Sequence, residues 1–271
     1  MLQSKDRIAV AYSGGKDSTT LLAVLAEIQK RFADLELIAI TLEEGVETAR
    51  DRRHTLSLTT QLLGIEHIST SYQEIYGVTL DEIHKQAKAL NSPLSTCAYC
   101  GVLRRQGLNI LARRIGADKL ALGHNLDDEI QSMFMNLIRG DIQRLSRISP
   151  VLKGIDGKLI PRIKPLYQIP EVEITYYAQG LSVAYYKCPC PYGSESLRTE
   201  IRKWLNSTEN LHPGTKSYLL TNFCKIIDAI KTEESNSIQL CQKCGEPTSR
   251  KLCSACEYIK KLFSSKDEVQ E

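Results

Sequence analysis

The chain has 271 residues, of which 42% are hydrophobic and 25% are charged, and its formal net charge is +3. These values are those of a globular protein, so disorder as the main state is excluded. No segment approaches the ~18 to 20 apolar residues that a membrane span requires, and residues 1–7 do not resemble a secretory signal. We therefore expect a cytoplasmic protein that does not engage a membrane.

Strand-like and helix-like segments alternate through the first 130 residues, the pattern of an α/β domain with a mostly parallel sheet. The predicted strands are 7–12, 36–42, 65–71 and 119–123. Predicted helices cover 17–31, 48–63 and 102–115. A fourth begins near Leu126 and directs Ile130, Met133, Phe134 and Leu137 into the core. Further helices are expected near 171–180 and 194–205.

A polar segment, 231–237, separates the main domain from a short carboxyl-terminal module. We predict a main domain over 1–230, a linker over 231–240, a module over 241–263 that is too short to bury its own core, and a flexible tail over 264–271.

The first predicted strand leads into a loop that suits a phosphate group. Two glycines let the backbone approach an anion closely, the following helix presents unpaired N–H groups, and a lysine adds a positive charge. The loop residues are Ser13, Gly14, Gly15, Lys16, Asp17 and Ser18. Their spacing differs from that of a Walker A loop. A plain strand–turn–helix would explain the glycines but not the polar residues around them.

This loop resembles the signature of the PP-loop ATP pyrophosphatases, which cleave ATP between the α and β phosphates and adenylate a substrate oxygen. The resemblance implies that residues 13–18 surround the pyrophosphate part of ATP, with Mg²⁺ shared between the phosphates and a carboxylate. A second match is Gly123-His124-Asn125-Leu126-Asp127-Asp128, where Gly123 and His124 would lie beside the nucleotide. Lys16 and Asp128 are the predicted catalytic residues on this side of the site. Two adjacent aspartates at a helix start, or a packed core histidine, would be the structural alternative.

Eight of the nine cysteines form close pairs, and in a protein without a secretion signal such pairs indicate metal or redox chemistry more than disulfides. Cys97 and Cys100 precede a basic helix, whose charge and amino end are expected to lower their thiol pKa values. Cys190, in a Cys-Pro-Tyr sequence, is the predicted third ligand, with Cys188 as the alternative. Three cysteines would leave one iron of a 4Fe-4S cluster open for exogenous sulfur. A persulfide or zinc at this site stays open. Cys224 is expected to be a packing thiol.

Two Cys-x-x-Cys pairs in the terminal module predict a structural zinc site, because four thiolates can surround the ion tetrahedrally and replace a missing core. The predicted ligands are Cys241, Cys244, Cys253 and Cys256. A small disulfide module is the alternative.

Positive charge is concentrated between residues 139 and 164, a segment that contains seven basic and two acidic residues and therefore has a local charge of +5. We expect this segment to contact an RNA backbone, although a solvated surface explains the charge equally well. The predicted RNA-binding residues are Arg104, Arg105, Arg139, Arg144 and Arg147.

Together these motifs resemble the TtcA/TtuA superfamily of tRNA 2-thiouridine synthetases, most closely its cytosolic tRNA 2-thiolation branch, from about Arg7 to Leu262. The resemblance implies ATP-dependent thiolation of a uridine in tRNA, a homodimer, and sulfur delivered by a thiocarboxylated ubiquitin-like protein. Members usually carry another Cys-rich module before the PP-loop, and only six residues precede the first predicted strand here. The target uridine, wobble or T-loop, stays open. The alternatives are a PP-loop enzyme that adenylates without transferring sulfur, such as a lysidine or amide-forming synthetase, and a noncatalytic RNA-binding scaffold.

Overall fold

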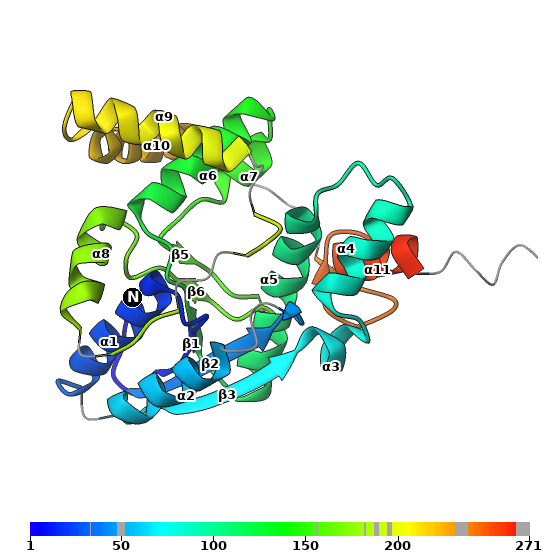
Figure 1. Cartoon of the computed structure of the whole chain (residues 1–271), viewed down its shortest axis with the longest axis horizontal. Helices are drawn as coiled ribbons and strands as arrows, with labels where there is room; N and C mark the ends of the chain where they lie inside the picture. The colour runs from blue at the N-terminus through cyan, green and yellow to red at the C-terminus, as the bar shows by residue number, and fades with distance from the viewer. Residues whose placement is uncertain are drawn as a thin grey trace, which may run out of the picture.

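A six-stranded sheet with strand order β3-β2-β1-β4-β6-β5 lies at the centre of the computed structural model (Figure 1). The structure describes residues 1–32, 34–47, 52–155, 157–181, 183–186, 190–193, 197–230 and 238–263. Five strands are parallel and the edge strand β5 (Val151–Leu152) is antiparallel to β6. The parallel strands are β1 (Arg7–Ala11), β2 (Glu36–Glu43), β3 (Glu66–Ser71), β4 (Lys119–Ala121) and β6 (Arg162–Ile163). The predicted α/β class with a mostly parallel sheet is confirmed.

Helices cover both faces of this sheet, which is why its central strands are apolar throughout rather than alternating. Alternate residues of β1 point to opposite faces, so Ile8 and Val10 join one core cluster and Ala9 joins another. The first cluster is closed by α1 (Lys16–Gln29), α2 (Arg52–Leu63) and α8 (Glu171–Gly180), and the second by α5 (Thr96–Arg114). The sheet is therefore the middle layer of three.

Two helical groups extend this frame (Figure 1). One buries Met133, Leu205 and Phe223 between α6 (Leu126–Ile138), α7 (Ile142–Ser146), α9 (Leu197–Leu211) and α10 (Thr215–Ile230). The other packs α3 (Tyr72–Tyr76), α4 (Leu80–Ala89) and the terminal module against α5. That module consists of β7 (Gln239–Leu240), β8 (Pro247–Thr248) and α11 (Ser254–Phe263). The module shares a hydrophobic cluster with α4 and α5 instead of forming its own.

The predicted strands and most predicted helices are present, with three informative differences. The helix predicted over 102–115 begins earlier, at Thr96, because the Ser95 side chain accepts a hydrogen bond from the Ala98 N–H and caps it. Leu137 was expected to face the core and is 49% exposed. Helices α3, α4, α7, α10 and α11 were not predicted, although Thr79 and Glu82 form a complete capping box before α4.

Several predictions fall outside the described residues: the starts of the helices expected at 48 and 194, the segment 231–237 and the tail 264–271. The division into main domain, linker and module therefore stays a prediction. Among the described residues, none of the helices is long and apolar enough to cross a membrane.

The prediction that residues 139–164 contact RNA is wrong for Lys164, because this side chain is buried. Its ammonium donates to Glu129 Oε2 at 2.8 Å, and the two side chains are 10% and 4% exposed. This ion pair connects the strand β6 to α6 inside the protein, so Lys164 serves the fold and is not available to an RNA backbone.

Replacing Lys164 tests this role. Lys164→Met is expected to lower the free energy of unfolding by about 3 to 5 kcal/mol, because it leaves the Glu129 carboxylate buried without a partner. A Lys164→Met/Glu129→Leu double variant should regain most of that loss, since no buried charge remains. Urea unfolding at neutral pH measures both, and equal losses in the two variants would contradict the interpretation.

Candidate active site

The loop between β1 and α1 is held open for an anion by its own polar residues. The Ser18 hydroxyl accepts from the Ser13 N–H at 3.2 Å and donates to the Gly15 carbonyl at 3.0 Å. Gly14 has φ +79°, a left-handed conformation that strains any other residue. Gly15 begins α1 and supplies no side-chain cap, so the N–H groups of the first turn are left for a ligand.

Lys16 lies between two carboxylates. Its Nζ is 2.9 Å from Asp17 Oδ1 and 2.7 Å from Glu171 Oε1, at the start of α8. Burial by itself lowers the pKa of Lys16, but the hydrogen bond to Glu171 and the charge of Asp17 outweigh it and raise that pKa. The lysine is therefore charged and already oriented at the loop where phosphates would bind.

The second nucleotide motif meets this loop where the strand order reverses. The chain builds the sheet outward from β1 through β2 and β3, then returns to add β4 on the other side of β1. Ligands of such sheets bind at the carboxyl ends of the two strands that flank this reversal. Gly123 follows β4, and a Cβ there would lie 3.3 Å from the backbone of both Asp17 and Ser18. Only glycine permits this close approach without moving the loop.

The two aspartates of the Gly-His-Asn segment have different surroundings. Asp127 is buried and accepts hydrogen bonds from the Glu171 N–H and the Lys216 ammonium, so it joins α6 to α8 and α10. Asp128 caps α6 with Asn125, and its Oδ1 is 3.3 Å from Arg198 Nη1. Asn125 also donates to Asp17 Oδ1 at 3.0 Å, which fixes Asp128 beside the PP-loop. Of the pair, Asp128 is the one placed for chemistry.

The pKa values of Asp128 and His124 are displaced in opposite directions. Burial, aided by the charges of Asp17 and Glu171, raises the pKa of Asp128 to about 6 against the opposing effect of Arg198. Burial and the nearby Lys164 and Arg198 lower the pKa of His124 to about 4. The His124 side chain has solvent-accessible surface, yet the protein atoms around it remove much of its hydration. This combination is expected of a side chain that lines a concave surface. At neutral pH the histidine is uncharged.

The three predicted sulfur ligands lie together on the other side of the sheet's carboxyl edge. Cys97 and Cys100 occupy the first turns of α5; in addition to burial, Cys190 and Cys100 both raise the pKa of Cys97, and Cys190 also raises the pKa of Cys100. The Cys97 thiol donates to the Tyr192 carbonyl at 3.0 Å, two residues after Cys190. All three are free cysteines, with Cys100 buried and the other two exposed. Cys188 lies outside the described residues.

The acidity expected of these thiols is not found. Burial raises the pKa of Cys97 and of Cys100, and Arg104 opposes this only in part. The positive charge and helix start anticipated from the sequence are present, since Arg104 Nη2 lies 3.2 Å from Cys100 Sγ. Desolvation nevertheless outweighs them, so these thiols stay protonated until a metal or sulfur species replaces the proton.

Tyr192 connects the third cysteine to the helices that surround it. Its hydroxyl donates to Asp81 Oδ1 at 2.6 Å, and its ring stacks on His84 with centroids 4.4 Å apart. His84 Nδ1 in turn lies 2.8 Å from the Thr96 hydroxyl at the start of α5. Two interactions therefore hold the Cys-Pro-Tyr segment against α4, and His84 connects α4 to the start of the helix that carries Cys97.

Two sets of contacts lie between the loop of residues 13–18 and the thiols. In the first, a Cβ on Gly14 would lie 3.5 Å from Cγ of Arg52. Glu44, after β2, bonds to Arg52 and Arg104 at 3.0 Å each, and Arg104 also contacts Cys100. In addition, the Tyr186 N–H donates to the Gly14 carbonyl at 2.7 Å. Cys190 follows only four residues later, a span of at most about 14 Å. Tyr186 therefore contacts the loop of residues 13–18, and Tyr192, six residues later, contacts Cys97.

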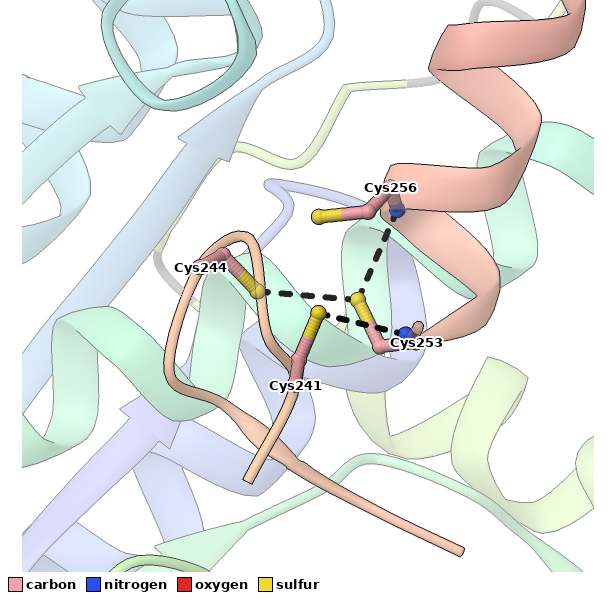
Figure 2. Close-up of side chains that lie close together, drawn as sticks. All are labelled: Cys241, Cys244, Cys253 and Cys256. Carbon is pink, nitrogen blue, oxygen red and sulfur yellow. Dashed lines mark hydrogen bonds between the residues drawn. The ribbon is translucent and has the colours of Figure 1, made fainter. Parts of the chain in front are cut away.

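The four cysteines of the terminal module, which we call the ribbon, form a compact cluster: Cys241, Cys244, Cys253 and Cys256. Their sulfur atoms all lie within 4.8 Å of one another, and Figure 2 shows the side chains directed toward a common centre. Tetrahedral thiolate ligands at ~2.3 Å from a metal ion would be about 3.8 Å apart. The Cys244 and Cys253 sulfurs are 3.6 Å apart, so this donor set fits such an ion. Gln106 of α5 donates to Cys253 at 3.4 Å and orients the cluster on the same helix that carries Cys97.

The predicted RNA-binding arginines divide into two groups. Arg139, Arg144 and Arg147 are exposed around α7, and Arg144 pairs with Asp141 at 3.2 Å. Arg104 and Arg105 lie on α5 near the thiols, where Arg104 is engaged by Glu44. Arg104 is thus positioned to influence Cys100 rather than a remote phosphate.

Comparison with known proteins gives consistent results. The sequence matches the PP-loop domain family over residues 2–209. It is 34% identical to the tRNA 2-thiolation protein NcsA of Haloferax volcanii over 93% of this chain and 81% of that protein. It is 36% identical to cytoplasmic tRNA 2-thiolation protein 1 of Caenorhabditis elegans over 97% of this chain and 70% of that protein.

A solved structure, the U34-tRNA thiolase NcsA from Methanococcus maripaludis with its 4Fe-4S cluster, superposes with a TM-score of 0.83 at 33% identity. The superposition covers 96% of this chain and 82% of the NcsA chain. The chain belongs to the PP-loop family of tRNA 2-thiolation proteins. The family resemblance of the sequence motifs is confirmed.

Sequence reasoning assigned no role to several residues of this PP-loop protein's site. Glu171, Arg198 and Tyr186 come from segments without a recognisable motif, and their contacts with Lys16, Asp128 and Gly14 depend on the fold. Tyr192 lies in the Cys-Pro-Tyr sequence, and Glu44 is an acid next to Gly45; these were the signals that the sequence offered.

The pH dependence of the reaction distinguishes Asp128 from His124. If the Asp128 carboxylate is required, kcat/KM for ATP should fall below an apparent pKa of about 6, because that raised pKa lets the carboxylate become protonated there. Asp128→Asn should lower the rate and remove this acidic limb. His124→Asn should retain the limb, since the pKa of His124 is about 4. Loss of the limb only in the histidine variant would reverse the assignment.

The contacts of Tyr192 predict a graded effect on metal binding at the three cysteines. Tyr192→Phe removes the bond to Asp81 but keeps the ring on His84, whereas Tyr192→Ala removes both. We expect Tyr192→Ala to weaken metal affinity about tenfold and Tyr192→Phe to have a smaller effect. Iron per chain after anaerobic reconstitution measures this, with the exposed Tyr218→Ala as control. Equal iron content in all three variants would exclude the positioning role.

Proposed function

We propose that this protein is an ATP-dependent enzyme that converts a uridine of tRNA, the wobble uridine at position 34, into 2-thiouridine. The contacts of one chain segment carry the proposal: Tyr186 bonds to the PP-loop, and Tyr192, six residues later, accepts the hydrogen bond of Cys97. An adenylating loop and sulfur ligands that one chain segment contacts suit a reaction that activates a base and then transfers sulfur to it. The names of the relatives support tRNA and position 34.

The reaction has two balanced steps. O2 of the uridine attacks the α-phosphate of ATP, and pyrophosphate leaves. Sulfide sulfur then attacks C2, and the C2–O bond breaks to release AMP. Lys16 and the N–H groups at the start of α1 would hold the phosphates and stabilise the charge that develops on them. Mg²⁺ would be shared between these phosphates and the Asp128 carboxylate beside the loop.

The solved relative carries a 4Fe-4S cluster, and in this chain Cys97, Cys100 and Cys190 would hold such a cluster. The chemistry of the donor set supports this, because three free thiols are available, Cys97 contacts the Tyr192 carbonyl two residues after Cys190, and Arg104 supplies a positive charge beside Cys100. Such a cluster supplies an iron without a protein ligand, where exogenous sulfide can bind. The residues of this chain contribute the three thiols and the orientation of Cys190 through Tyr192.

The remaining assignments complete the proposal. Zinc would occupy the ribbon, since four thiolates leave no open position and make the ion structural. A thiocarboxylated ubiquitin-like donor, a homodimer and a cytoplasmic location follow from the family resemblance. The Caenorhabditis elegans relative is named as a cytoplasmic protein.

Cysteine variants test the proposal directly. Cys97→Ser, Cys100→Ser and Cys190→Ser should each lose tRNA thiolation and bound iron while retaining ATP binding. Cys224→Ser is the matched control, because Cys224 is a free, half-buried thiol that contacts Tyr167, away from the cluster. Mass spectrometry of nucleosides from treated tRNA detects 2-thiouridine.

Two experimental outcomes would contradict this function and favour another one. Full activity of the Cys97 and Cys100 variants on their substrate would indicate a PP-loop enzyme that adenylates without sulfur. Binding of tRNA without binding of ATP, measured by calorimetry, would indicate a noncatalytic RNA-binding protein.

A further inference from the structure

Two arginines beside the thiols have no acidic partner among the described residues. Arg105 Nε donates to the Gly101 carbonyl at 3.2 Å, and Arg162 Nη2 donates to the Arg105 carbonyl at 3.5 Å. Neither guanidinium forms an ion pair in the part of the chain that the structure describes. By contrast, their neighbours Arg104, Lys164 and Arg198 are each paired with a carboxylate.

These unpaired cations are close enough to repel one another. Burial and then Arg144 lower the pKa of Arg105, and burial and then Arg105 lower that of Arg162. Both charges also act on His124. Gathering like charges without a compensating acid costs free energy in the free protein, and an anion bound among them would recover it.

Arg162 shows a second sign of an unsatisfied site. Its Nε is buried and has no hydrogen-bond partner. Buried polar groups without partners are rare in native proteins. Arg105, in contrast, is exposed by surface area yet desolvated, as expected on a concave surface. A ligand that entered there would reach Arg105 first, and Arg162 Nη2, which contacts the Arg105 carbonyl, lies beside it.

The arginines lie between the two halves of the proposed active site. Arg105 follows Arg104 on α5, and its side chain bonds to the residue after Cys100. Arg162 pairs with Leu120 of β4, the strand that leads into Gly123 and the nucleotide segment. Adjacent strands are about 4.8 Å apart, so the Arg162 backbone is one strand away from that segment.

We propose that Arg105 and Arg162, assisted by Arg144, bind the phosphodiester next to the uridine that is thiolated. This inference rests on the proposed function and adds a specific contact to it. The guanidinium fork matches the geometry of phosphate oxygens, and phosphate contacts fix the orientation of a nucleic acid without reading its sequence. A base turned out of its stack toward both ATP and sulfur needs its backbone held beside it. The phosphates of ATP have their own cradle at residues 13–18.

Arg162→Gln is the first test in the full-length protein. It should weaken tRNA binding about tenfold and reduce the slope of log affinity against log salt by about one. ATP affinity and iron content should be unchanged. Arg31→Gln is the control, because Arg31 is exposed beyond the end of α1, at the opposite edge of the sheet. Arg162→Lys keeps the charge without the fork and should recover part of the affinity.

Combining the Arg162→Gln variant with RNAs that lack the charge of one phosphate identifies the phosphate that Arg162 contacts. Anticodon stem-loop RNAs carry one uncharged methylphosphonate, placed on the 5′ or the 3′ side of the target uridine. At one of these positions it should weaken binding to the wild-type protein but add little to the effect of Arg162→Gln, because both changes remove the same contact. For the control variant Arg31→Gln, the methylphosphonate should weaken binding as much as it does for the wild-type protein.

The outcomes separate this inference from the proposed function. If wild-type protein thiolates tRNA but Arg162→Gln binds with unchanged affinity and salt slope, or the two changes are additive at both positions, the phosphodiester site is wrong and the function stands. If Arg162→Gln instead weakens ATP binding, the arginines serve the nucleotide. If wild-type protein neither binds nor thiolates tRNA, the proposed function itself fails.

Discussion

The close approach of the β4 segment to the PP-loop is the constraint on which the rest of the site depends. Gly123 lies against the backbone of Asp17 and Ser18, where a Cβ would be only 3.3 Å away. This contact brings Asn125 and Asp128 to the loop that holds Lys16. It exists because the sheet reverses its strand order between β1 and β4, which opens a crevice at their carboxyl ends.

Helix α5 gives this crevice its second half. It carries Cys97 and Cys100 in its first turns, Arg104 and Arg105 in the next, and Gln106 against the ribbon cysteines. One rigid element therefore positions the sulfur ligands, the neighbouring charges and the terminal module. Since the module also shares a hydrophobic cluster with α5, a metal ion in the ribbon would stabilise the helix that bears the reactive thiols.

The charges of the site follow from burial more than from residue type. Asp128 has a pKa of about 6 and His124 one of about 4, the reverse of their ordinary order. The thiols of Cys97 and Cys100 are likewise less acidic than their basic neighbours suggest. In each case the protein atoms around the group disfavour its charged form, an effect that the sequence of the motif does not contain.

The sequence by itself determined the α/β class, the PP-loop, the Gly-His-Asn segment and the four-cysteine ribbon, because each depends on residue types at fixed short spacing. Local rules also sufficed for β1 to β4 but did not predict the two-residue strands β5 to β8, and they failed at α5, where Ser95 caps the helix before its apolar pattern begins. Only the tertiary structure decided the burial of Lys164 with Glu129, the role of Glu171 at Lys16, and the lack of an acidic partner for Arg105 and Arg162 among the residues that the structure describes. These depend on contacts between residues far apart in the chain, whose distances are set by the packing of the sheet and its helices.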